Sequence, residues 1–222
     1  MSGILFSKEA PELAWSRFAA RGYANPACGL VYSSDAPPSN GMPVGGVGTG
    51  CIDIEGDGTM GFCTVFNSHV PRRGPLNLPF LGVAVGRRIF VLTTKNLSGL
   101  EAVEPYVGIK GLPKVDTARR VRYWGHYPAL DLEFTIDEPL AIGVRAFSAF
   151  MPGDSRLSNT PGAVFDVLLR NDGSEAMVGR LAFSFPGPTS AEAGFPAAFA
   201  RQDAPASVGP AAGIRWGMCQ SE

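Results

Sequence analysis

The sequence predicts an all-β protein, an antiparallel β-sandwich with a short N-terminal helix. Glycine (28 residues) and proline (19 residues) are both used more often than average, and these residues favour frequent turns between short strands. Turn signals also separate apolar segments at the spacing typical of a sandwich. No alternation of strand and helix patterns is visible, so a doubly wound fold is not expected.

The only good helix candidate spans residues 7–21. Ser7 is a suitable N-cap, acidic residues occupy the first turn, and Gly22 can end the helix. Leu13, Trp15 and Phe18 supply large apolar groups for packing. We therefore expect residues 1–40 to form a helix and a connector, and residues 41–222 to form the sandwich.

A glycine-rich stretch follows, and we expect its glycines to have a structural role. Glycine lets two backbones approach closely and adopts positive φ without steric cost. The glycines concerned are Gly45, Gly46, Gly48 and Gly50.

A β-hairpin is predicted directly after these glycines. Ile52 and Ile54 alternate with acidic residues, and Gly56-Asp57-Gly58 supplies the turn. A turn centred on Asp57 places Ile54 opposite Met60 and Ile52 opposite Phe62. The same register places Cys51 opposite Cys63 on the other face of the hairpin.

Further strands are predicted along the rest of the chain, with a long loop over residues 95–117. The segments are 80–85, 88–93, 119–124, 130–136, 140–150, 163–170 and 177–185. After residue 186 the sequence is rich in Ala, Pro and Gly, and only residues 213–218 have the pattern of one more strand.

Charge and composition exclude several classes of partner. The 19 basic and 20 acidic residues give no electrostatic reason to expect a nucleic acid or an anionic membrane. No apolar run is long enough for a transmembrane segment, and the N-terminus lacks the basic and apolar regions of a signal peptide. The four cysteines show no C-x-x-C spacing, so we expect reduced thiols and a cytoplasmic location.

No cofactor or metal site is expected. A dinucleotide-binding G-x-G-x-x-G motif would need glycine at position 51, where the sequence has Cys51. An EF-hand loop beginning at Asp53 would need glutamate at position 64, where the sequence has Thr64. The two histidines, His69 and His126, lack further zinc ligands at regular spacing. No G-x-S-x-G nucleophile elbow is present, although the sequence leaves a Ser-His-Asp triad open.

Three residues near a predicted strand end are candidates for contact with carbohydrate. Trp124, His126 and Tyr127 lie within the run RYWGHYP, and rings beside polar groups can stack on the apolar face of a sugar. The alternative, which we favour for each ring, is packing inside the sandwich.

Five stretches of the sequence carry a resemblance to a known family: residues 42–50, 61–67, 127–128, 146–171 and 181–185. Together they resemble the N-terminal domain of glycoside hydrolase family 116, which includes non-lysosomal glucosylceramidase and bacterial β-glucosidases. Pro152 and Asp154 lie in a turn of this pattern and are expected to be structural.

The resemblance implies a two-domain enzyme, in which a β-sandwich precedes a larger catalytic domain of paired α-helices in a toroid. The nucleophilic Glu and the acid/base Asp belong to that second domain, so we assign no catalytic residue here and expect this chain alone to be inactive. The partner is then the catalytic domain of the same polypeptide, and the full enzyme would hydrolyse a β-glycoside or a glucosylceramide-like substrate with retention. The resemblance further implies a sandwich truncated at its C-terminal end, since more strands would follow Met218. The rival hypothesis is a stand-alone, non-catalytic carbohydrate-binding or structural module.

Overall fold

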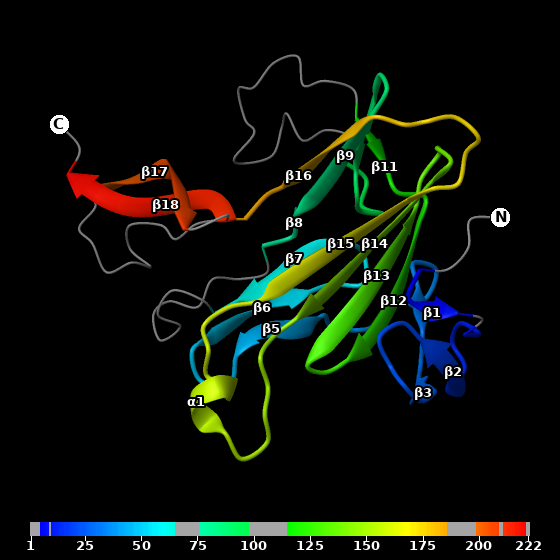
Figure 1. Ribbon diagram of the computed structural model, residues 1–222, viewed down its shortest axis with the longest axis horizontal. Helices are drawn as coiled ribbons and strands as arrows, with labels where there is room; N and C mark the ends of the chain where they lie inside the picture. The colour runs from blue at the N-terminus through cyan, green and yellow to red at the C-terminus, as the bar shows by residue number, and fades with distance from the viewer. Residues whose placement is uncertain are drawn as a thin grey trace.

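The computed structural model is built almost wholly of β-strands (Figure 1). It describes residues 5–8, 10–64, 76–97, 115–185, 199–208 and 211–220. Within these residues the single helix is the one-turn α1 (Ser155–Ser158), and it cannot cross a membrane. The predicted all-β class is confirmed.

The first layer is a five-stranded antiparallel sheet with the strand order β15-β14-β13-β12-β4. Four of its strands were predicted from the sequence, and only the short β4 was not. The strands are β4 (Tyr32–Ser33), β12 (Arg120–His126), β13 (Ala129–Thr135), β14 (Leu140–Phe147) and β15 (Val164–Asn171).

The second layer contains two four-stranded sheets, with the orders β5-β6-β7-β8 and β11-β10-β9-β16. Their pairs are antiparallel except for β10 and β11. The first sheet contains β5 (Met42–Gly46), β6 (Gly50–Ile54), β7 (Thr59–Cys63) and β8 (Leu78–Pro79). The second contains β9 (Leu81–Val85), β10 (Arg88–Val91), β11 (Asp116–Thr117) and β16 (Gly179–Phe183).

The main core lies between these layers. Leu130, Leu132 and Phe134 alternate along β13 with Asp131 and Glu133, so one face of the five-stranded sheet is apolar and the other is charged. The apolar face joins a continuous buried cluster with residues of β5 to β7, β9 and β10, and Figure 1 shows these strands alongside β12 to β15. The arrangement is a sandwich, and it leaves the charged face of β12 to β14 for the N-terminal segment.

The N-terminal helix prediction is wrong. The segment instead forms a three-stranded antiparallel sheet of β1 (Ser7–Lys8), β2 (Ser16–Ala20) and β3 (Ala27–Gly29). Leu13 has a φ of 58°, outside the helical range, and its N–H donates to Val31 O. Phe18 and Ala20 share one face of β2 and pack with Val31 in a second small core. Burial at this core outweighs a weak helix propensity.

The predicted register of the β6–β7 hairpin is correct near the turn and wrong beyond it. Ile54 pairs with Met60 as expected, but Ile52 pairs with Cys63 and not with Phe62. One residue of β6 thus faces two residues of β7, which is a β-bulge. The bulge turns Phe62 outward, to 38% exposure, and buries Cys63.

The expected pairing of Cys51 with Cys63 is wrong for the same reason. Cys51 O accepts from Thr64 N at 2.8 Å, and Cys51 N donates to Thr64 Oγ1 at 3.0 Å. Cys28, Cys51 and Cys63 are reduced thiols, as predicted. Cys219 lies in β18.

The C-terminal strand prediction is confirmed and extended. Residues 213–218 fall within β18 (Ala211–Gln220), which pairs antiparallel with β17 (Phe199–Val208). The sequence analysis missed β17, since its Ala- and Pro-containing sequence has no clear alternation. Most of the predicted 95–117 loop lies outside the described residues.

Candidate functional site

An open groove of about 800 Å³ lies where β12 ends beside β3 and the preceding loop. It brings the three carbohydrate candidates from the sequence together with residues of the N-terminal segment. Its lining includes Trp15, Tyr23, Asn25, Trp124, His126 and Tyr127.

Trp124 forms the floor of this groove and offers little surface to a ligand. Its side chain is 3% exposed, and its ring meets Phe18 edge to face at 4.9 Å. Gly29 lies against the indole, since a Cβ there would stand 2.5 Å from Trp124 Nε1. The packing alternative considered for this ring therefore describes Trp124 well.

His126 is held on three sides. Its ring stacks on Trp124 at 3.8 Å, and its Nδ1 lies 2.7 Å from Tyr23 Oη in a hydrogen bond. His126 Nε2 lies 3.3 Å from Asp131 Oδ2 without hydrogen-bond alignment. These contacts fix both the His126 ring and the Tyr23 hydroxyl, which comes from the N-terminal segment.

The charge behind the groove is neutralised. Asp131 and Arg145 are cross-strand neighbours and form two hydrogen bonds of 2.7 Å, one to each carboxylate oxygen. Arg145 Nη1 also donates to Arg21 O at 2.6 Å. The hydrogen bond to Asp131 raises the pKa of Arg145, while burial raises the pKa of Tyr23 and Arg145 opposes that rise. Both groups therefore keep their ordinary protonation at neutral pH.

Tyr127 faces outward at the rim. It lies in the turn between β12 and β13, its peptide bond to Pro128 is cis, and its side chain is 50% exposed. Its ring meets Phe150 edge to face at 5.2 Å.

Sequence reasoning missed Trp15 and Tyr23 as groove residues. Trp15 was expected to pack on the helical face of residues 7–21, but it is 74% exposed, and Tyr23 is 45% exposed. No local pattern reveals this placement, because the groove forms only when the N-terminal segment folds onto β12.

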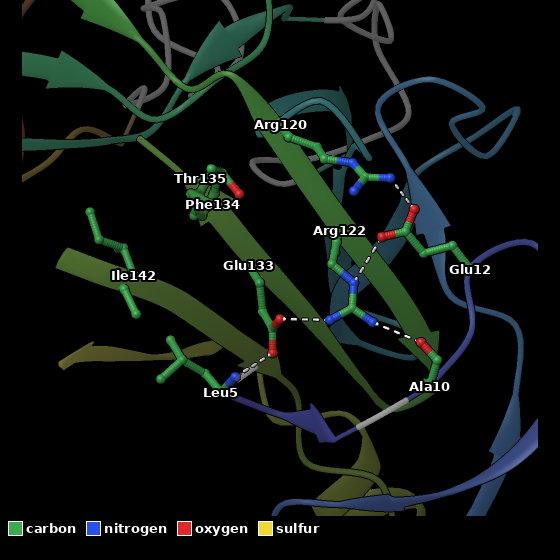
Figure 2. Close-up of a pocket in the computed structure, with 10 residues that line it drawn as sticks. Leu5, Ala10, Glu12, Arg120, Arg122, Glu133, Phe134, Thr135 and Ile142 are labelled. Carbon is green, nitrogen blue, oxygen red and sulfur yellow. Dashed lines mark hydrogen bonds and ion pairs between the residues drawn. The ribbon is translucent and has the colours of Figure 1, made fainter. Parts of the chain in front are cut away.

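A second cavity, of about 450 Å³, lies on the same face of the sheet and is dominated by ion pairs (Figure 2). Arg122 Nη1 donates to Glu133 Oε2 at 3.1 Å, and Arg122 Nε lies 3.1 Å from Glu12 Oε1. Arg120 also pairs with Glu12. Leu5 N donates to Glu133, on the opposite side of Arg122 from Glu12, as Figure 2 shows.

This ionic network fastens the N-terminal segment to the sheet. Glu133 Oε1 accepts from Leu5 N at 2.8 Å and from Phe6 N at 2.6 Å, and Arg122 Nη2 donates to Ala10 O at 3.1 Å. Because each of these charges already has a partner within the protein, we regard the cavity as structural.

The predicted structural glycines form the tip of the β5–β6 hairpin. Gly45 and Gly50 have φ values of +147° and +92°. A Cβ on Gly46 would stand 2.8 Å from Thr160 O, and Gly48 N donates to Asn159 Oδ1 at 2.7 Å. The hairpin tip therefore lies directly against the residues after α1.

The other two predicted structural residues shape the start of α1. Pro152 and Gly153 occupy a turn closed by Asp154 N donating to Met151 O at 3.0 Å. Asp154 then caps α1, since its Oδ1 accepts from Leu157 N at 2.9 Å. This cap orients the segment that meets the glycine hairpin.

Carboxylates elsewhere in the described residues show no metal-binding arrangement, since no group of three or more His, Cys, Asp or Glu side chains is gathered there. Glu55 is a carboxyl group whose pKa is raised. Its burial is the main cause, the nearby Asp53 and Asp57 add to it, and a hydrogen bond from the Gly41 backbone opposes it.

Two comparisons with known proteins bear on these features. A family model described as "beta-glucosidase 2, glycosyl-hydrolase family 116 N-term" matches residues 41–207. A search of curated proteins found no match.

Proposed function

This chain belongs to the N-terminal domain family of glycosyl-hydrolase family 116, and from that premise we propose that it is the non-catalytic sandwich domain of a retaining β-glucosidase or glucosylceramidase-like enzyme. The observation that carries the proposal is the family match over residues 41–207, which runs from the glycine hairpin into β17. The role of the domain is to support a C-terminal catalytic domain and to shape the substrate entrance.

The carboxylates around the two cavities favour a non-catalytic role. Retaining hydrolysis needs two carboxyl groups about 5–5.5 Å apart that face the substrate, one of them with a raised pKa. Glu12, Asp131 and Glu133 are instead paired with arginines. Paired carboxylates that hold strands together are poorly suited to proton transfer.

Glu55 is the strongest rival as a catalytic acid, because its pKa is raised. Its side chain, however, lies close to the backbone at Gly41 and Gly61. A Cβ on Gly61 would stand 1.8 Å from Glu55 Oε1, and one on Gly41 would stand 2.9 Å from Glu55 Cδ. Glu55 is partly buried against Gly61 at the bulge of the β6–β7 hairpin, and this burial explains its raised pKa.

A supporting role agrees with the physical needs of such an enzyme. A catalytic carboxylate pair must be held within a fraction of an ångström by its surroundings, and a sandwich with a continuous buried core is a rigid support. The β-glycoside or glucosylceramide-like substrate and the cytoplasmic location remain part of this proposal. The reduced thiols of Cys28, Cys51 and Cys63 support a reducing compartment.

The proposal is tested by assaying the purified chain with p-nitrophenyl β-D-glucoside, for which we expect no turnover above buffer. Glu55→Gln and Asp131→Asn serve as the matched variants. Turnover that either substitution abolishes would assign catalysis to this domain and overturn the proposal.

Co-expression with the proposed catalytic domain tests the supporting role itself. We expect the coding sequence downstream of this chain to encode a long segment with helical periodicity, and its co-expression with the chain to yield hydrolysis. The stand-alone module is instead favoured if the coding sequence ends without such a segment.

A further inference from the structure

Beyond this supporting role, we propose that the groove between β3 and the β12–β13 turn is a carbohydrate-binding site. Its ligand is a neutral, β-linked glucosyl saccharide, and Trp15, Tyr23 and Tyr127 are the rings on which the sugars stack. The choice of a β-glucosyl ligand rests on the proposed function, whereas the site and its neutral character rest on the geometry of the groove.

The exposure of these three rings is the first observation. Trp15, Tyr23 and Tyr127 are 74%, 45% and 50% exposed, and all three line one groove. Large exposed aromatic groups that gather around a concavity are typical of binding surfaces. Aromatic rings with a polar tip suit a sugar, which presents both an apolar face and hydroxyl groups.

The second observation is that the groove is already ordered. Trp124 is buried beneath it and packs on Phe18, and the hydrogen bond between His126 Nδ1 and Tyr23 Oη fixes the Tyr23 hydroxyl. The Arg145 guanidinium carbon lies over the Tyr23 ring, 5.9 Å from its centre. A preformed site loses less conformational entropy on binding.

The third observation concerns charge. The Arg145 guanidinium lies beside the Tyr23 ring, and Asp131 binds it through both oxygens. A phosphate or carboxylate ligand would have to compete with that ion pair. Exposed Asn25 and the Tyr23 hydroxyl line the groove, and both are neutral hydrogen-bonding groups.

The size of the groove agrees with a saccharide. Its volume of about 800 Å³ lies within the usual range of roughly 300–1,000 Å³ for ligand sites. Its open form suits an extended chain of sugars that enters and leaves along the surface.

The test is calorimetric titration of the 222-residue chain with cellotetraose. We expect saturable binding, and we expect Trp15→Ala to weaken the binding by about tenfold, which corresponds to about 1.4 kcal/mol for the lost stacking contact. Tyr127→Ala should weaken binding in the same direction. Because Trp15 and Tyr127 are exposed, both variants should keep the thermal melt of the unmodified chain.

Phe185→Ala is the matched control. Phe185 is also an exposed ring, at 45%, but it lines a different cavity beside Gly45 and Phe165. We expect the Phe185→Ala variant to bind cellotetraose with unchanged affinity. Absence of saturable binding would overturn the site, as would a Trp15→Ala, Tyr127→Ala double variant with full affinity. Either result would leave the proposed supporting role intact, because that role is tested by co-expression and hydrolysis.

Discussion

Gly45 shows how strongly a single backbone position is constrained in this protein. Its φ of +147° disfavours any L-residue, and a Cβ there would stand 2.3 Å from Gly50 O on the paired strand. The contact is with backbone, so no side chain can move aside to relieve it. Gly162 is a useful contrast, because a Cβ there would meet nothing within 4 Å.

We therefore expect Gly45→Ala to lower the free energy of unfolding by about 2 kcal/mol or more, from backbone strain and overpacking. Gly162→Ala should change it by less than about 0.5 kcal/mol. Urea denaturation followed by circular dichroism measures both. Equal stabilities for the two variants would show that the β5–β6 hairpin tolerates a wider separation of its strands.

At the scale of elements, the N-terminal sheet is held to the charged face of the sandwich by two means. Phe18, Val31 and Trp124 form the small apolar core, and Arg122 joins Glu133 to the N-terminal backbone beside it. Arg122 and Glu133 side chains are each 13% exposed, so their charges are largely removed from water.

Removal of one charge from this network should be costly. We expect Arg122→Met to lower the free energy of unfolding by about 3 kcal/mol, because it removes the cation paired with Glu133 in a mostly buried site and one of the two arginines paired with Glu12. The matched control is Arg119→Met, since Arg119 pairs with Asp137 at the surface, and there the expected loss is below about 1 kcal/mol. Denaturation of the two variants at low and high salt makes the comparison.

A loss as small for Arg122→Met as for Arg119→Met would contradict this account. It would mean that the apolar contacts of Phe18 and Trp124 alone hold the N-terminal sheet in place.

At the scale of the whole molecule, part of the exposed apolar surface lies on two strands that end their sheets. β15 is the last strand of the five-stranded sheet, and β16 is the last strand of its four-stranded sheet. Large apolar side chains on and beside these strands are exposed: Val164, Leu169, Leu181, Phe183 and Phe185. Terminal strands and apolar patches both favour association with a partner. Under the proposed function, the catalytic domain or further strands of the sandwich would cover this surface.

We therefore expect the isolated chain to self-associate or to bind a hydrophobic dye. A version that ends at Gly187 should behave in the same way, since it keeps β15 and β16. Light scattering and dye fluorescence on both proteins provide the measurement. A monomeric chain that binds no dye and melts sharply would contradict the expectation. Dye binding by the 222-residue chain alone would place the dye-binding apolar surface beyond residue 187.

Local sequence was sufficient for most strands of the sandwich. Leu130, Leu132 and Phe134 alternate with charged residues, and an alternation of period two determines which face of a strand is buried. Gly86 and Arg87 between two apolar runs were enough to predict the β9–β10 hairpin. The family resemblance likewise depended on short local patterns, and the family match confirms it.

Only the tertiary structure decided the N-terminal sheet, the bulge and the groove. Phe18 is in a strand because Trp124, more than 100 residues later, offers it a buried contact. Phe62 points outward because the β6–β7 pairing accommodates one extra residue beside Gly61. Trp15, Tyr23 and Tyr127 share one groove only after the N-terminal segment folds over β12. The reason is physical: side-chain periodicity reflects contacts within one element, whereas these features depend on contacts between residues far apart in the chain.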